Sequence, residues 1–122
     1  MELDREQVLE RFLLYSGEDE ETASPERKAL WEALCEGGAK WAEAQAGPGA
    51  AGWEESLVGL AAAQAFYHLV LADGALLPGS LSTPEVKLDW AAREEKARAL
   101  AQEQQRLCGP VLRDGDFYFG RA

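Results

Sequence analysis

The chain has 122 residues, of which 47% are hydrophobic and 28% charged, and its formal net charge is −10. This length predicts one domain, residues 1–122, with a single core that buries roughly two thirds of the unfolded surface. The acidic balance argues against direct, sequence-specific binding of nucleic acid, which needs clustered lysines and arginines on one face.

The negative charge is concentrated in the first half of the chain. Residues 1–55 contain 14 acidic and 5 basic side chains, whereas residues 56–122 contain 8 and 7. An acidic half of this kind can face a basic partner surface, or it can keep the protein soluble. We favour the second interpretation on composition alone.

The first predicted helix begins after Asp4, a good N-cap residue, and ends at about Tyr15. Its apolar positions recur with helical spacing, and Gly17 supplies the left-handed conformation that ends many helices. The acidic run that follows consists of Glu18, Asp19, Glu20 and Glu21 and is either a solvated loop or the start of the next element. These four residues are candidate interaction residues, together with the aromatic residues of the C-terminal arm.

The clearest helix start in the chain is Ser24-Pro25. Serine caps the helix, and proline at the first helical position has no N–H to leave unpaired. Apolar residues with helical spacing continue to about Ala46. Gly37-Gly38 lies inside this pattern and predicts a kink or a close approach to another helix.

A third helix is predicted from about Glu54 to Ala72, after a connector of small residues at 46–52. It is apolar nearly all round, which is typical of the central helix of a domain. Asp73-Gly74 is expected to end it. The longest apolar run, 57–72, has 16 residues, so we interpret it as a core helix and not as a membrane span.

The segment Thr83–Trp90 is ambiguous. Val86, Leu88 and Trp90 alternate with charged residues as in a strand, yet Thr83-Pro84-Glu85 is equally a helix start. We favour a short extended segment here, with the last helix beginning near Asp89 and ending at Leu107 or Cys108. The predicted fold is therefore all-α: a compact bundle of four main helices, an irregular or short extended segment near 82–90, and an aromatic C-terminal arm at 114–122.

Nothing in the sequence indicates a reaction. The only histidine, His68, has no complementary partner one turn away, and no metal-ligand or phosphate-loop spacing occurs. Cys35 and Cys108 lie far apart in helical contexts and are expected to be buried thiols rather than a disulfide. We therefore expect a non-enzymatic protein without cofactor or metal. The acidic N-terminus lacks a secretion signal, which favours the cytoplasm.

The C-terminal arm carries three adjacent aromatic residues, Phe117, Tyr118 and Phe119. In an extended arm Phe117 and Phe119 point to one side and Tyr118 to the other. Two-sided apolarity near a chain end suits an arm between two surfaces, for example a strand added to a neighbour. An arm folded back on its own helices fits the pattern equally well.

Several features occur in an order seen in one class of helical proteins. A short helix ends at Tyr15-Ser16-Gly17, and an acidic stretch precedes Ser24-Pro25. A long helix at 27–36 and an alanine-rich helix at 60–68 follow, and the chain closes with an aromatic segment at 116–121. In the order and residue composition of its helices the chain resembles the head–tail connector proteins of tailed phages and prophages. These proteins are small and mostly helical, and they form a ring beneath the portal.

This resemblance implies a subunit that assembles through protein–protein contacts. Its partners would be further copies of itself in a ring and other phage structural proteins such as portal or tail components. Its location would be the cytoplasm of a bacterial host or the virion. The alternative is a small acidic regulator that mimics the charge of DNA and binds a nucleic-acid-binding protein, with residues 18–36 as its exposed carboxylate face.

Overall fold

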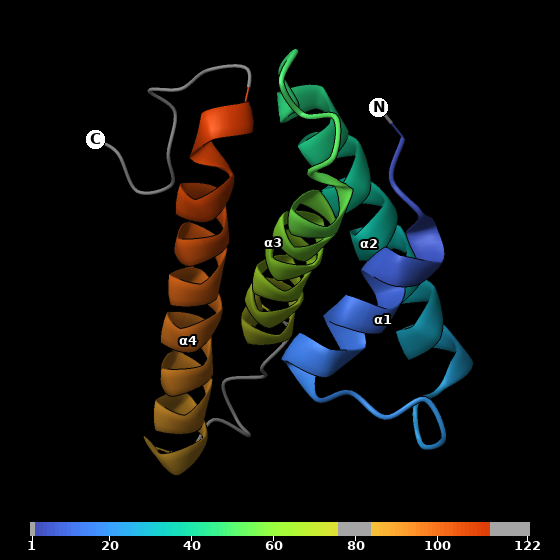
Figure 1. The fold of residues 1–122 in the computed structure, drawn as a ribbon. Helices are drawn as coiled ribbons and strands as arrows, with labels where there is room; N and C mark the ends of the chain where they lie inside the picture. Colours follow the sequence, from blue (N-terminus) through green and yellow to red (C-terminus); the bar gives the residue numbers. More distant parts are fainter. Residues whose placement is uncertain (1, 76–83, 113–122) are drawn as a thin grey trace.

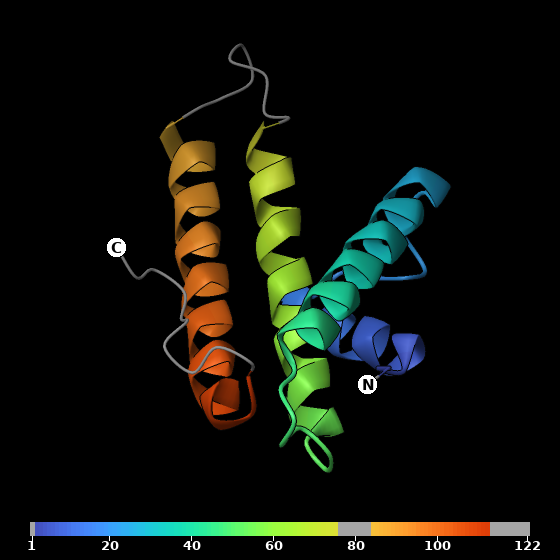
Figure 2. The same cartoon turned by 90° about the horizontal axis from the view of Figure 1, so that it is seen from above.

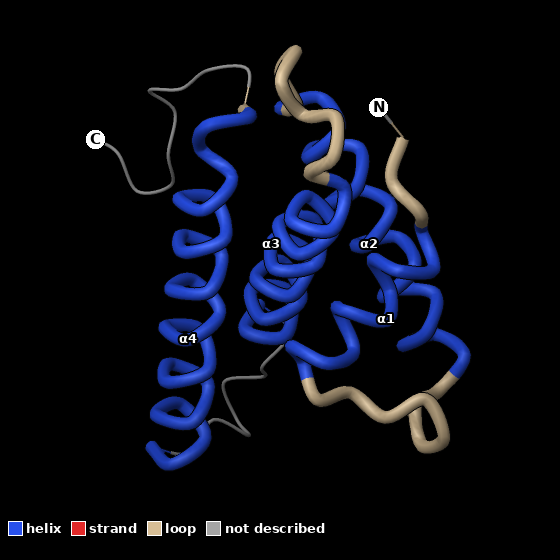
Figure 3. Tube along the Cα trace, in the orientation of Figure 1, coloured by secondary structure: helices blue, strands red, loops and turns tan. Residues whose placement is uncertain are grey.

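The computed structural model describes residues 2–75 and 84–112 of the chain. They form four helices, α1 (Arg5–Ser16), α2 (Pro25–Gln45), α3 (Glu54–Ala75) and α4 (Pro84–Cys108), followed by a 3-10 turn, η2 (Gly109–Val111). No strand occurs within the described ranges, so the predicted all-α bundle is confirmed (Figure 1, Figure 3).

α3 is the central element of the fold. It packs against α1, α2 and α4, whereas α4 contacts only α3 and η2 among the described elements. α4 runs alongside α3 in both views, and α1 and α2 cover the other side of α3 (Figure 1, Figure 2). This arrangement explains why α3 is apolar nearly all round: helices surround it.

The ends of α1 and the start of α2 follow the predicted signals. The Asp4 carboxylate accepts hydrogen bonds from the amides of Glu6 and Gln7, and Gly17 ends α1 in the left-handed region at φ 72°. Ser24 accepts from the amide of Arg27, directly before Pro25. These caps satisfy helix-end groups that would otherwise be unpaired.

Gly38 marks the close approach of α2 and α3 that the glycine pair predicts. A Cβ added at Gly38 would lie 2.5 Å from the backbone oxygen of Ala61, whereas one added at Gly37 would meet nothing within 4 Å. Only one glycine of the pair is therefore required by packing. The small neighbours Ala39, Ala42, Ala61 and Ala65 are all fully buried.

The predicted end of α3 at Asp73-Gly74 is wrong, because the helix continues to Ala75. Gly74 instead accommodates the indole of Trp90: a Cβ there would lie 2.3 Å from ring carbons of Trp90. The indole Nε1 donates a 2.8 Å hydrogen bond to the carbonyl oxygen of Val70. Gly74 is thus needed for helix–helix contact and not for helix termination.

The extended segment favoured for Thr83–Trp90 is also wrong, since α4 begins at Pro84. The helix-start signal of Thr83-Pro84-Glu85 outweighs an alternation that covers only three apolar residues. Trp90 belongs to the helical pattern instead. It shares the face that continues with the buried residues Ala97, Ala101, Gln105 and Cys108.

The connector between α2 and α3 is held by the end of α4. Ala46 and Leu112 form an isolated antiparallel bridge, and the amide of Gly47 donates to the carbonyl of Val111 at 2.7 Å. Cys108 lies nearby and donates from Sγ to the carbonyl of Ser56 at 3.4 Å. The last described residues therefore close one end of the bundle.

Candidate interaction surface

The acidic run after α1 does not act as one unit in the structure. Glu18 is mostly covered, and its carboxylate accepts hydrogen bonds from Arg27 Nε at 2.6 Å and Trp31 Nε1 at 3.1 Å. Asp19 organises the turn, accepting from the amide of Glu21 at 2.9 Å. Glu20 and Glu21 are exposed. Of the four predicted interaction residues, Glu18 and Asp19 thus have roles inside the domain.

Arg27 lies at the centre of a network that joins three helices. Its two terminal nitrogens donate to the carboxylate of Asp73 near the end of α3, at 2.6 and 2.9 Å. Asp73 also accepts from Arg93 of α4 at 3.1 Å. The guanidinium of Arg93 lies 5.6 Å from the ring centre of Phe66, within range of a cation–π contact. Asp73 therefore links α2 to α4 through α3.

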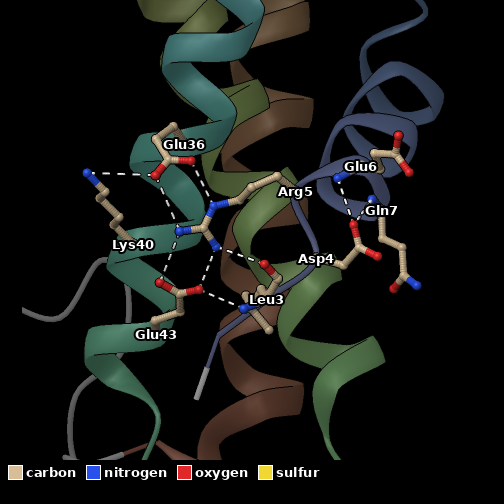
Figure 4. Close-up of polar contacts among 8 residues, drawn as sticks. All are labelled: Leu3, Asp4, Arg5, Glu6, Gln7, Glu36, Lys40 and Glu43. Atoms are coloured by element: carbon tan, nitrogen blue, oxygen red, sulfur yellow. Dashed lines mark hydrogen bonds and ion pairs between the residues drawn. The ribbon is translucent and has the colours of Figure 1, made fainter.

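A second network ties the N-terminal segment to α2 (Figure 4). Arg5 donates to Glu36 at 2.7 Å and to Glu43 at 2.5 Å, two carboxylates that lie two turns apart on α2. Glu43 also accepts from the amide of Leu3 at 2.6 Å. Lys40 lies 3.7 Å from Glu36 on the outer side of this cluster. Leu3, only 3% exposed, is buried beside this anchor.

Both networks stabilise the ionised carboxylates. Hydrogen bonds from Arg5 lower the pKa of Glu36 and of Glu43 below the ordinary range. Hydrogen bonds from Arg27, and to a smaller extent from Arg93, lower the pKa of Asp73. These groups remain charged at neutral pH, which is the arrangement expected of structural ion pairs rather than of acid–base catalysts.

The carboxylates left on the surface lie in the loop before α2 and along α2 itself. Within residues 18–36 the exposed acidic side chains are Asp19, Glu20, Glu21, Glu26 and Glu32. They surround the start of α2 without forming a metal-binding group: no set of three His, Cys, Asp or Glu side chains suited to a metal occurs among the described residues. These exposed carboxylates form an acidic surface that can keep the protein soluble or face a basic partner.

Among the residues whose burial the structure describes, three leucines are the large apolar side chains that lie exposed. Leu14 is 76% exposed, Leu107 47% and Leu71 39%. Leu14 borders a groove of about 490 Å³ between α1 and α3, whose other walls include Arg11, Glu55 and Val58. Sequence reasoning did not single out Leu14, because it adjoins the apolar stripe of α1 without belonging to it.

The remaining candidate residues divide between surface and core. His68 is exposed, and its Nε2 lies 3.3 Å from Nε2 of Gln64. Cys35 and Cys108 are buried free thiols, as predicted. Burial raises the pKa of Cys35 to about 12 and also raises the pKa of Cys108. The predicted contact residues Phe117, Tyr118 and Phe119 lie outside the described residues.

One helix has the length and composition of a membrane span. Residues 54–74, with a mean hydropathy of 1.3, meet that criterion, and 61% of this window is buried inside the domain. The same composition is required by the position of α3 between the other helices.

Comparison with known proteins gives no relative from which to assign a role. No protein-family model matches the chain, and no curated protein or solved structure matches it. The residues themselves therefore carry the functional argument.

Proposed function

We propose that this chain is a non-enzymatic prophage structural protein, a head–tail connector or adaptor subunit that assembles through protein–protein contacts. In this proposal it forms a homo-oligomeric ring and contacts other phage structural proteins such as portal or tail components. It acts in the bacterial cytoplasm during assembly and then in the virion.

The observation that carries the proposal is that charged side chains form ion pairs between different elements of the domain. Arg5 and Arg27, on the N-terminal half of the chain, are both engaged in ties between elements. Partly buried ion pairs with several hydrogen bonds hold helices at fixed relative positions. A small domain braced in this way suits a rigid building block of a ring.

A second line of support is the packing of the two segments on which the resemblance depends. Residues 27–36 belong to α2 and residues 60–68 to α3. α2 and α3 approach closely at Gly38 and Ala61. The same two helices would thus form the subunit core, leaving α1, the outer face of α4 and the arm for contacts with neighbours.

The proposal is tested by measuring molar mass by light scattering at high protein concentration, with and without portal protein. We expect a mass several times that of the 13.3 kDa chain, or a complex with portal protein. Deleting residues 116–122 should abolish the assembly and leave the helical circular dichroism unchanged. A monomer whose mass does not change with concentration or with portal protein would contradict the proposal.

A DNA-mimicking regulator is the second candidate. The exposed positions of Glu20, Glu21, Glu26 and Glu32 favour it, because a charge mimic needs carboxylates that a basic partner can reach. Here the charge reversals Glu20→Lys and Glu21→Lys should abolish partner binding, whereas removal of the arm should not. The two candidates are therefore separated by two variants of the same chain.

A further inference from the structure

Leu14 on α1 has the largest exposed fraction of the three exposed leucines. It borders a groove of about 490 Å³ between α1 and α3, and the buried Val58 forms part of the wall. We call it the Leu14 groove. One exposed leucine is ordinary on a protein surface. An exposed leucine in a groove that adjoins further apolar surface is typical of a contact site.

The exposed apolar surface continues onto α4. α1 and α4 both pack on α3, and their side chains meet at Gly59. A Cβ added at Gly59 would lie 2.9 Å from Oε1 of Gln104 and 3.2 Å from Nη1 of Arg11. Leu14 follows Arg11 by three positions, and Leu107 follows its own neighbour at this point by three as well. Both exposed leucines therefore lie within one helical turn of the same point.

The charged side chains that remain available in this groove are acidic. Glu10 is exposed, and its carboxylate takes part in no hydrogen bond or ion pair among the described residues. Glu55 is 92% exposed and lies 3.8 Å from Arg11. Arg11 also donates to the hydroxyl of Tyr15 at 3.2 Å and lies over its ring. An exposed ion pair as long as that of Glu55 is weak, so both carboxylates can pair with a new cation.

Other grooves in the described part of the chain contain charged side chains that already hold the domain together. The groove beside the connector is lined by small and acidic side chains, and its Glu43 is paired with Arg5. The groove between α1 and α2 contains Arg5 together with its second partner, Glu36. The groove before α2 contains the pair of Glu18 and Arg27. A ligand in any of these grooves would compete with a structural ion pair.

Charge determines which occupant the Leu14 groove fits. Its exposed carboxylates repel the phosphates of nucleic acid. A second copy is also disfavoured, because it would bring the same carboxylates and a net charge of −10 to the contact. A segment of another protein that combines an apolar side chain with lysine or arginine complements both the leucines and the carboxylates.

We propose that the Leu14 groove binds a basic amphipathic segment of another protein. An apolar side chain of that segment packs against Leu14 and Val58, and its lysines or arginines pair with Glu10 and Glu55. Leu107 extends the apolar contact onto α4. This contact follows from the surface alone and does not rest on the connector role, so it holds equally for a monomeric chain.

Binding of a fluorescent synthetic peptide to the full-length chain tests this proposal. The probe is an amphipathic peptide of leucine and lysine, and a peptide with glutamate in place of every lysine is its control. Fluorescence anisotropy measures the Kd. We expect the lysine peptide to bind at least about tenfold more tightly than the glutamate peptide, and added salt to weaken its binding. Equal affinities, or no binding of the lysine peptide, would overturn the proposal.

Substitution of the exposed leucine tests the apolar part of the contact. Leu14→Ser should weaken binding of the lysine peptide at least about tenfold, as expected for a central contact residue. Leu71→Ser, at an exposed leucine near the C-terminal end of α3, is the matched control and should change the Kd less than about twofold. Circular dichroism checks that both variants keep their helices. Equal losses for the two variants would show that the groove is not the binding site.

Substitution of the carboxylates tests whether charge acts at this place or over the whole surface. Glu10→Gln combined with Glu55→Gln should weaken binding at least about fivefold. The control combines Glu26→Gln with Glu32→Gln, which changes the net charge by the same amount. Its positions match, because Glu26 and Glu55 lie in first turns and the other two within helices. The proposal fails if the control pair weakens binding as much or more, since the peptide then binds the start of α2 or the net charge alone.

Discussion

The guanidinium of Arg27 and the carboxylate of Asp73 form a pair of hydrogen bonds, at 2.6 and 2.9 Å, between the first turn of α2 and the last turn of α3. The two residues are 46 positions apart in sequence. Both side chains are about three quarters covered, at 28% and 23% exposed. A bidentate pair in this setting fixes the relative orientation of the two helices.

Removing the charge of Asp73 should therefore destabilise the fold. Asp73→Asn keeps one carbonyl oxygen but loses the second charged acceptor for Arg27 and Arg93. We expect the free energy of unfolding to fall by about 1.5–3 kcal/mol, the usual effect of losing a hydrogen bond to a charged group. Urea unfolding followed by circular dichroism measures this change.

The exposed Glu20→Gln is the matched control for the loss of a carboxylate, because it removes the same charge from a solvated position. It should change the free energy of unfolding by less than about 0.5 kcal/mol. Equal effects of the two substitutions would show that general charge, and not the ion pair, determines the result.

Acid should weaken the same network. The pKa of Asp73 is lowered in the folded state by Arg27, so the stability it contributes is fully present above the ordinary carboxyl pKa of about 4. That stability is lost as the pH falls through the lowered folded-state value. The difference in unfolding free energy between wild type and Asp73→Asn should be constant above about pH 5 and shrink below pH 4.

The comparison with Asp73→Asn is necessary because acid also relieves the mutual repulsion of a chain with a net charge of −10. Relief of that repulsion affects both proteins alike and cancels in the difference. A difference that is independent of pH from 6 to 2.5 would contradict the role assigned to Asp73.

The glycine pair in α2 provides another test. Gly38→Ala places a methyl group 2.5 Å from the backbone oxygen of Ala61, so α2 and α3 must separate. Overpacking of this kind costs about 1–3 kcal/mol. Gly37→Ala meets nothing within 4 Å and should stabilise the helix by about 0.5–1 kcal/mol. Thermal unfolding of both variants should give shifts of opposite sign, and two shifts of the same sign would contradict the packing.

The sequence predicts the helix ends well, because a helix cap depends only on residues close together in the chain. Asp4, Ser24-Pro25 and Gly17 mark helix ends because a cap involves only neighbouring residues. At the start of α4 two local signals conflict: the alternation of three apolar residues predicts a strand, whereas Thr83-Pro84 predicts the helix that the structure shows.

Other features depend on residues distant in sequence and could not be predicted from it. Asp73-Gly74 resembles a helix end in sequence, whereas the structure shows that glycine is required at position 74 because the indole of Trp90 packs against it. Likewise, all four residues of the run 18–21 are acidic, but their environments differ because Arg27 and Trp31 donate hydrogen bonds to the carboxylate of Glu18. Composition therefore points to the acidic run as a whole, and the tertiary contacts decide which of its carboxylates remain exposed.

The two native thiols should be unreactive while the protein is folded. Burial raises the pKa of Cys35 to about 12 and also raises that of Cys108, so little thiolate is present at pH 8. A disulfide reagent should label both at least about a hundredfold more slowly than the thiol of the variant Ala99→Cys, because Ala99 is exposed on α4 and attack needs both the thiolate and access. Absorbance of the released thiol measures the rates, and unfolding in guanidinium should make all thiols react alike. Prompt labelling of the two native thiols in the folded protein would mean that α2 or α4 opens readily, which the burial of both side chains in the core argues against.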